Sequence, residues 1–308
     1  MALSSFSLSH AKYYTKSLPH LALKPTILAQ STGFDSKFHS RGISETFSEL
    51  KKQGKAALIP YVTAGDPDLA TTSKILQLLD RCGADVIELG VPFFDAPLDG
   101  PVIKYFSCNF YNKALSNGIT LDAILSMLKE VVPHLSCPIV LFSYHTPVFE
   151  YGIESSLSAI KDAGIHGLLV PDLSFDDNAR LKQAAAENEV QLVLLTTPVT
   201  PRRQMEAIVD ASQGFVYLVS SVGVTGDRAT VNPQVELLLK EIKGITANPV
   251  AVGFGISNPE HVKKVASWGA DGVIVGSAIV RLIGEGKSSN EILKNVETFV
   301  SSLKAALP

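Results

Sequence analysis

The stretch PVAVGFGISNPEHVKKVASWGADGVIVGSAIVRLIG, residues 249–284, contains two copies of one pattern. Each copy has a short run rich in Val, Ile and Ala, then a glycine-containing turn, then a segment with the apolar period of a helix. A short β-branched run that is apolar throughout is typical of a strand buried on both faces, as in a parallel sheet covered by helices. The stretch therefore predicts two successive units of strand and helix.

The same alternation extends along the chain from about Ile43 onward. Strands are predicted at residues 56–62, 84–91, 138–144, 166–172, 191–197, 214–220, 249–255 and 271–277. Helical patterns lie between them, and several end in the glycine that a helix C-terminus favours. This count predicts the α/β class and a closed (β/α)8 TIM barrel. An open doubly wound sheet is the alternative, but the turn after the first strand lacks a GxGxxG fingerprint.

Two additional helices flank the predicted barrel. ISETFSELKKQ (43–53) is expected to close its bottom, and NEILKNVETFVSSLKAAL (290–307) has an apolar stripe that is expected to pack outside. Residues 41–308 are thus predicted to form a single catalytic domain. Residues 1–40 are excluded from it, because the first 34 residues contain no Asp or Glu, several Ser and Thr, and scattered Lys. That composition predicts a disordered organellar transit peptide, with an ordinary disordered tail as the alternative.

Composition excludes several classes of partner. The 308 residues are 46% hydrophobic and 19% charged, which indicates a soluble globular chain. The net charge of -3 leaves no basic surplus for a nucleic acid, and no apolar run has the length of a membrane span. Cys82, Cys108 and Cys137 lack metal or CxxC spacing, so reduced thiols are expected.

Carboxylates dominate the polar residues at the predicted C-terminal strand ends, where such barrels place their active sites. Glu88 lies within the apolar run 84–91, and Asp95 and Asp99 follow in the next loop. An ionised carboxylate is costly in apolar surroundings unless it is paired or its pKa is shifted. No lysine lies at a strand end, which disfavours a Schiff-base aldolase, and the histidines do not converge on a metal site. The sequence therefore predicts metal-free acid–base chemistry.

Glycines form a second group at the same strand ends. SVGVTG (221–226), GFGIS (253–257) and GSA (276–278) follow the last three predicted strands, and GSA begins a helix. Exposed backbone amides beside a helix N-terminus bind anions, and phosphates bind at this position in many barrels. A small phosphorylated substrate is therefore predicted, with its reacting end toward Glu88. The apolar lining of its pocket is predicted to come from Phe93, Leu98, Leu125, Tyr144, Leu173 and Phe254.

Six motifs together resemble one known family. They are ELGVPF.D…DGP (88–101), GLLVPDLS (167–174), LTTP.TP (195–201), FVYLVSSVGVTG (215–226), PVAVGFGIS.PEHV (249–262) and WGADGVIVGSAIV (268–280). In this order and spacing they are similar to the tryptophan synthase alpha chain in its plant plastid form. The resemblance covers about residues 43–308. It implies a TIM barrel that cleaves indole-3-glycerol phosphate to indole and glyceraldehyde 3-phosphate, and a chloroplast location.

The resemblance also implies roles for individual residues. Glu88 matches the general acid/base carboxylate, and Asp99 matches the carboxylate that stabilises positive charge at the indole nitrogen. The predicted substrate-binding residues are Tyr217, Thr225, Phe254 and Tyr144. The predicted phosphate-binding residues are Gly226, Gly255, Gly276 and Ser277. No metal and no cofactor are expected in this chain, since pyridoxal phosphate would belong to a beta-chain partner in an α2β2 complex.

The sequence departs from the family pattern next to the matched carboxylates. PFFDAPLDGP (92–101) places Phe94 where the family has a small polar residue, and the following segment 102–118 replaces a shorter, Ala-rich helix. In the family this region contributes to the beta-chain contact and the lid over substrate. Two alternatives therefore stay open, namely a stand-alone indole-3-glycerol phosphate lyase that releases free indole and a non-catalytic regulatory subunit.

Overall fold

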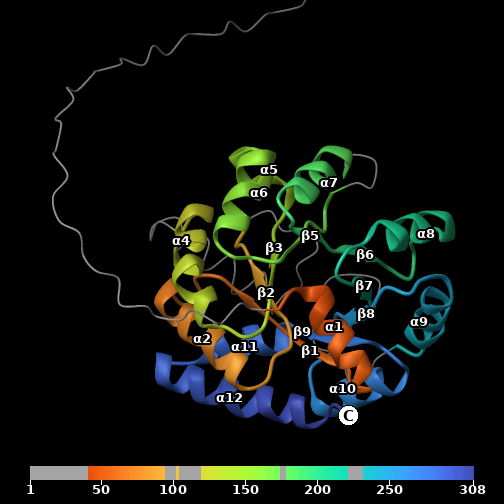
Figure 1. Cartoon of the computed structure of the whole chain (residues 1–308). Coiled ribbons are helices and arrows are strands. Elements are labelled where there is room, and N and C mark those ends of the chain that lie inside the picture. Colours follow the sequence, from red (N-terminus) through yellow and green to blue (C-terminus); the bar gives the residue numbers. More distant parts are fainter. Residues whose placement is uncertain (1–40, 94–101, 104–118, 174–177, 221–231) are drawn as a thin grey trace, which may run out of the picture. The chain divides into compact units, whose positions relative to one another are not determined.

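Short strands that are buried along nearly their whole length form the centre of the structure (Figure 1). The computed structural model describes residues 41–93, 102–103, 119–173, 178–220 and 232–308, all within the compact unit Lys37–Pro308. The strands are β1 (Ala57–Thr63), β2 (Ile87–Gly90), β3 (Ile139–Phe142), β4 (Gly167–Leu169), β5 (Gln191–Leu192), β6 (Leu194–Thr196), β7 (Val216–Val219), β8 (Val250–Gly253) and β9 (Gly272–Val275). Each predicted strand is confirmed, although most are shorter than expected.

All strand pairs are parallel, in the order β5-β4-β3-β2-β1-β9-β8-β7-β6. The two ends of this order are neighbours in the chain, because only Val193 separates β5 from β6. The predicted strand 191–197 is therefore one barrel strand, whose first part pairs with β4 and whose second part pairs with β7. The Val193 amide continues the ladder by donating to Leu168 O at 2.9 Å. This closure confirms the predicted eight-stranded TIM barrel.

Helices surround the barrel (Figure 1). They are α1 (Ile43–Lys52), α2 (Leu69–Arg81), α4 (Leu121–Val131), the 3-10 helix η1 (Val132–His134), α5 (His145–Tyr151), α6 (Ile153–Asp162), α7 (Asn178–Glu187), α8 (Arg202–Ala211), α9 (Gln234–Ile245), α10 (Pro259–Ser267), α11 (Ser277–Glu285) and α12 (Ser289–Ala305). Side-chain caps fix several of their starts. Asp68 accepts from Thr71 N at 2.6 Å before α2, and Asn258 accepts from His261 N at 2.8 Å before α10.

Helix α1 closes the bottom of the barrel, as predicted. Its residues Ile43, Phe47 and Leu50 are buried and belong to the cluster that fills the barrel interior. The Phe47 ring lies 5.4 Å from the Phe215 ring, just before β7. The barrel makes room for the helix with glycines, since a Cβ on Gly167 would lie 2.6 Å from Ile43 Cδ1.

Two aspartates tie neighbouring strands together at this same end, and we call them the aspartate clamps. Asp85, before β2, accepts from Leu58 N on β1 at 2.7 Å and from Lys304 Nζ at 2.6 Å. Asp271, before β9, accepts from Val250 N on β8 at 2.8 Å and from Lys243 Nζ at 2.8 Å. Each clamp therefore joins a strand, its neighbour and a helix.

The C-terminal helix α12 packs outside the barrel, against α2 and α11 (Figure 1, dark blue). It buries Ile292, Val296, Val300 and Leu303, which lie on one stripe at the spacing of helical turns. The sequence prediction for this helix is confirmed. None of the helices that the structure describes is long and apolar enough to cross a membrane.

Candidate active site

Glu88 is a buried carboxyl group in the barrel interior. It lies on β2 with Tyr61 of β1 and Val140 of β3 as its register partners. Its side chain is only 2% exposed, and Oε1 has no hydrogen-bond partner. Burial disfavours the charged form, and this raises the pKa of Glu88 from 4.5 to about 8. The carboxyl therefore keeps its proton at neutral pH.

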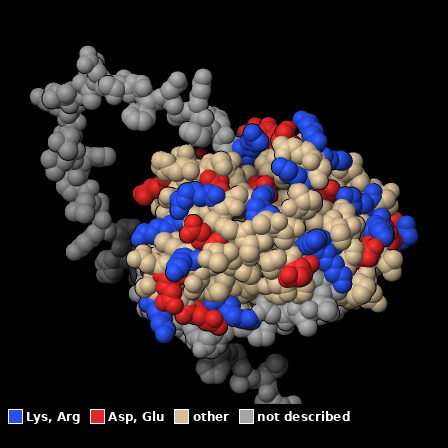
Figure 2. Space-filling model, turned by 90° about the horizontal axis from the view of Figure 1, so that it is seen from below, with Lys and Arg blue, Asp and Glu red and all other residues tan. Residues whose placement is uncertain are grey.

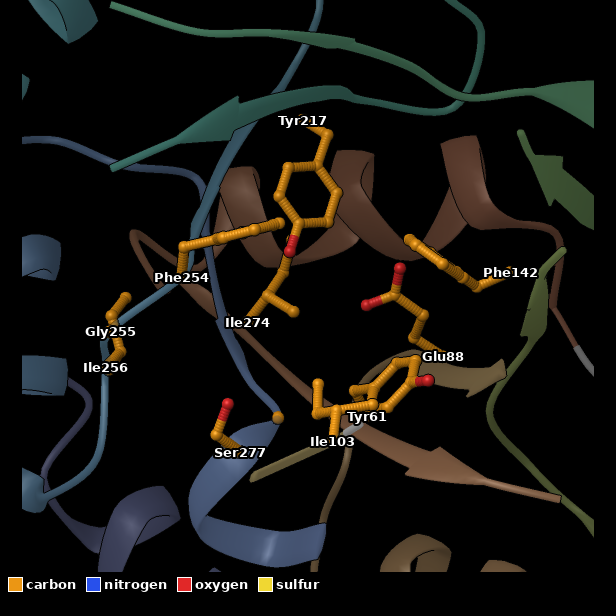
Figure 3. A pocket seen from close by; sticks show the side chains of 11 residues that line it. Tyr61, Glu88, Ile103, Phe142, Tyr217, Phe254, Gly255, Ile256, Ile274 and Ser277 are labelled. Carbon is orange, nitrogen blue, oxygen red and sulfur yellow. The ribbon is translucent and has the colours of Figure 1, made fainter. Parts of the chain in front are cut away.

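A pocket of about 500 Å³, partly open to solvent, lies in front of this carboxyl. Its lining residues are Tyr61, Glu88, Ile103, Phe142, Tyr217, Phe254, Gly255, Ile256, Ile274, Gly276 and Ser277. Figure 3 shows the Glu88 carboxyl pointing into this space, with Tyr217 opposite and Phe142 and Tyr61 beside it. The pocket is mostly apolar with few polar groups, which suits a flat aromatic ligand held by specific polar contacts.

Tyr217 faces Glu88 from β7. Its ring is 5% exposed, and burial, the neighbouring Glu88 and the neighbouring Tyr61 together raise the pKa of its phenol well above 10. The phenol therefore stays neutral. Its hydroxyl lies over Gly253, where a Cβ would be 2.3 Å from the oxygen, so glycine is required at that position.

The turn after β8 brings an aromatic ring into the pocket through unusual backbone angles. Phe254 and Gly255 both have a φ of 73°, in the left-handed region that residues other than glycine seldom adopt. The Phe254 carbonyl accepts a hydrogen bond from Ser220 Oγ, and its ring meets Tyr217 edge-on at 5.9 Å and 82°. These two contacts hold the strained residue in place. The turn also exposes Gly255 and Ile256 to the pocket.

The far end of the pocket is formed by the start of α11. Gly276 is the N-cap residue of this nine-residue helix, and Ser277 is its first residue. The unpaired amides at a helix N-terminus and the helix dipole both favour an anion. Because Gly276 and Ser277 line the same pocket as Glu88, the helix N-terminus can bind an anionic group of a ligand while the protonated carboxyl contacts its other end.

The structure brings together six of the predicted site residues that it describes. Glu88, Tyr217, Phe254, Gly255 and the pair Gly276–Ser277 all line the pocket. Asp99, Thr225 and Gly226 lie outside the described residues, as do Asp95 and Leu98.

Tyr144 was predicted to bind substrate, and the structure places it beside the pocket residue Phe142. It is buried two residues past β3, with its ring 5.9 Å from that of Phe142 and 5.6 Å from that of Phe93. It does not line the pocket. Two of the predicted apolar lining residues also lie elsewhere, because Leu125 is buried in the outer core between helices and strands and Leu173 packs against that core.

Sequence reasoning missed five lining residues, namely Tyr61, Ile103, Phe142, Ile256 and Ile274. Most of them are apolar residues that a sequence pattern assigns to ordinary core. A signal was present for Tyr61, since it has the same strand parity as the buried Ala57 and Ile59, which belong to the barrel interior. Inward parity at the C-terminal end of a barrel strand indicates a pocket residue.

Charge on the described surface is mixed rather than segregated. On the face shown in Figure 2, Lys and Arg side chains are interspersed with Asp and Glu. Among the residues that the structure describes, no group of three or more His, Cys, Asp or Glu side chains is arranged to hold a metal ion.

Comparisons with known proteins agree with this geometry. The family model described as tryptophan synthase alpha chain matches residues 47–308. The tryptophan synthase alpha chain of Arabidopsis thaliana is 57% identical over 266 residues, which cover 86% of this chain and 95% of that protein.

Solved structures show the same likeness. A Mycobacterium tuberculosis tryptophan synthase chain superposes with a TM-score of 0.77 at 30% identity, covering 87% of this chain and 98% of the other. A chain of the Pyrococcus furiosus tryptophan synthase complex gives a TM-score of 0.73 at 38% identity, covering 82% and 98%. On these grounds, the chain belongs to the tryptophan synthase alpha chain family.

Proposed function

We propose that this protein cleaves indole-3-glycerol phosphate to indole and glyceraldehyde 3-phosphate, as the alpha chain of a tryptophan synthase. The observation that carries the proposal is the protonated, buried Glu88 in one pocket with the helix N-terminus at Gly276 and Ser277. The apolar walls between them suit the indole ring, and the helix N-terminus suits the phosphate.

Glu88 is proposed to act first as an acid and then as a base. Its proton goes to indole C3, which gives an indolenine with a partly cationic N–H. The carboxylate then takes the proton of the glycerol hydroxyl next to C3 as the carbon–carbon bond breaks. The oxygen of that hydroxyl becomes the aldehyde carbonyl, and the bond electrons return to the ring to restore indole. A raised pKa suits this cycle because the group must deliver and recover a proton near neutral pH.

The other proposed roles follow the resemblance. Asp99 is proposed to stabilise the positive charge at the indole nitrogen, and Thr225, which follows β7 in the chain, to fold over Asp99. Tyr217, Phe254 and Tyr144 are proposed as substrate-binding residues, with Tyr144 acting from behind the pocket wall. The proposed phosphate contacts are Gly226, Gly255, Gly276 and Ser277. None of these steps requires a metal ion or a Schiff base in this chain.

A beta chain is proposed as the partner, in an α2β2 assembly. The Pyrococcus furiosus relative is described as part of a tryptophan synthase complex, and 98% of its chain is covered by this one. Pyridoxal phosphate belongs to the beta chain rather than to the alpha chain. The departure of residues 94–118 from the family pattern keeps the stand-alone lyase as the competing candidate.

Indole release measured with purified protein, alone and with a beta chain, tests the proposal. Acceleration by the beta chain supports the synthase subunit, and fast release without it supports the stand-alone lyase. Release in neither case leaves the regulatory subunit. Glu88→Gln should abolish turnover, because the amide has no proton to deliver to C3, while affinity for glycerol 3-phosphate stays nearly unchanged. A Gln variant with appreciable turnover would contradict the role given to Glu88.

Residues 1–40 are proposed to direct the protein to the plastid stroma. The absence of Asp and Glu from residues 1–34 and the plant origin of the Arabidopsis thaliana relative support this. Import into isolated chloroplasts, with and without these residues, is the test. Import that is equally efficient in both cases would contradict the proposal.

A further inference from the structure

Tyr61 reaches across a neighbouring strand inside the barrel. It belongs to β1, and its ring meets the Phe142 ring of β3 edge-on at 5.7 Å and 84°. Strand β2 lies between β1 and β3, and Gly90 is the residue of β2 that is in register with Phe142. The Tyr61 ring must therefore cross β2 at Gly90 to make this contact.

The missing side chain of Gly90 is what permits the crossing. A Cβ on Gly90 would lie 2.1 Å from the Tyr61 hydroxyl oxygen and 2.7 Å from its Cζ. Gly90 is two residues beyond Glu88 on the same strand, so both face the barrel interior. The tip of Tyr61 therefore occupies the space directly beyond Glu88, on the side toward the barrel mouth.

Among the residues that the structure describes, two aromatic rings cover the Glu88 carboxyl on its own side of the pocket. Tyr61 and Phe142 flank Glu88 on its own side of the pocket, and the carboxyl points between them toward Tyr217 (Figure 3). Among the pocket residues that the structure describes, the other titratable groups that face Glu88 are the phenols of Tyr61 on β1 and Tyr217 on β7. Lysine, arginine and histidine are absent from the described lining.

We propose that Tyr61, seated in the space left by Gly90, is a positioning residue that covers Glu88 and holds its carboxyl toward the substrate pocket. The effect of Tyr61 that we expect on turnover rests on the proposed function. The effect that we expect on the pKa of the Glu88 carboxyl rests on the geometry alone. Tyr61 also lines the pocket, and its proposed effect on proton transfer is exerted through Glu88.

The test is a double-mutant cycle in the full chain. Tyr61→Ala removes the cover, and Gly90→Ala displaces it. Each should lower kcat by on the order of tenfold to a hundredfold, with a smaller change in KM, because the proton donor is misplaced. Water admitted beside Glu88 should lower its pKa. The fall of kcat at high pH should therefore begin about one pH unit lower than in the wild type. Both substitutions disrupt the same placement of the Tyr61 ring beside Gly90. The kcat of the double variant should therefore be no lower than that of Tyr61→Ala alone.

Two controls separate positioning from a general structural effect. Tyr61→Phe keeps the ring and should keep the wild-type pH profile. Leu237→Ala alters an exposed side chain on α9 and should shift neither the profile nor kcat. Circular dichroism confirms that each variant is folded.

A direct titration of Glu88 makes failure of this inference distinguishable from failure of the proposed function. The carboxyl signal of Glu88 in 13C-glutamate-labelled protein, assigned by its loss in Glu88→Gln, reports the pKa without any turnover. A lower pKa in Tyr61→Ala, with the wild-type value kept in Tyr61→Phe, supports the inference even if the wild type releases no indole. An unchanged titration in Tyr61→Ala, or additive losses in the double variant, would overturn it.

Discussion

At the scale of single residues, Glu88 links protonation to stability. Its pKa is about 8 in the folded chain and 4.5 when exposed, so folding favours the protonated form. The stabilisation that this proton gives is complete below about pH 4.5 and is lost as the pH rises toward 8. A buried group whose function requires a proton therefore lowers the free energy of unfolding at high pH.

Glu88→Gln should remove this dependence, because the amide is neutral at every pH. From pH 4.5 to 8, the wild type should lose free energy of unfolding relative to the Gln variant by an amount on the order of a few kcal/mol. Urea unfolding of both proteins across this range is the measurement. Parallel curves for the two proteins would show that Glu88 is not desolvated in solution.

A second prediction for a single residue concerns Gly276, which lies at the end of the pocket where the phosphate is proposed to bind. A Cβ on Gly276 would lie 3.4 Å from Tyr61 Cβ, an ordinary contact, so Gly276→Ala should fold. Gly276→Asp adds a negative charge beside the bound phosphate and should raise KM at least about tenfold through repulsion. Gly276→Asn, of matched size, should raise it much less. Equal KM values for Asp and Asn would mean that the phosphate binds elsewhere.

At the scale of elements, the packing of α1 in the barrel bottom should contribute strongly to the free energy of unfolding. Phe47 is 2% exposed and packs on Phe215 inside the barrel bottom. Phe47→Ala should lower the free energy of unfolding by about 3–4 kcal/mol, the usual cost of a large aromatic side chain removed from a core. Urea unfolding measures this effect, and the exposed Leu237→Ala should change it by about 0.5 kcal/mol or less.

The same variant separates stability from chemistry. Phe47 lies at the barrel bottom and Glu88 near the opposite, C-terminal strand ends, so the pH profile of turnover should not move. A shifted profile in Phe47→Ala would show that the two ends are coupled.

Sequence reasoning was most successful for the strands and least successful at their ends. Apolar β-branched runs predicted every barrel strand, because parallel strands are buried on both faces. Between β3 and β4 the structure has two helices, α5 and α6, because Gly152 lies between them and interrupts the helical period. Tyr144 lies two residues past β3, so the direction of its ring could not be predicted. Residues just past a strand no longer alternate strictly, so parity cannot say which way a ring points.

For the site, sequence reasoning identified Glu88 and two glycines that line the pocket but few of its apolar walls. Glu88 and the glycines at 255 and 276 were recognisable because a charge or a glycine is unusual within an apolar run. Tyr61 and Phe142 lie in apolar runs that look like ordinary core in the sequence. Their place in the pocket depends on the register of three strands. Such a register is a property of the folded barrel rather than of any local stretch.

At the scale of the whole molecule, the described residues begin at Arg41 and all lie within the compact unit Lys37–Pro308. A chain that lacks residues 1–36 should therefore keep the wild-type free energy of unfolding within about 0.5 kcal/mol and should release indole at the same rate. Urea unfolding and the indole assay check this. A loss of stability on truncation would show that the leading residues support the barrel.

The aspartate clamps and the α1 plug lie at one end of the barrel, and Glu88 with its pocket lies toward the other. The hydrogen bonds that join β1 to β2 and β8 to β9 through these aspartates are therefore remote from the pocket. A substitution among the described pocket residues should leave these bonds in place. The pocket can thus change in sequence while the end that joins the strands stays the same.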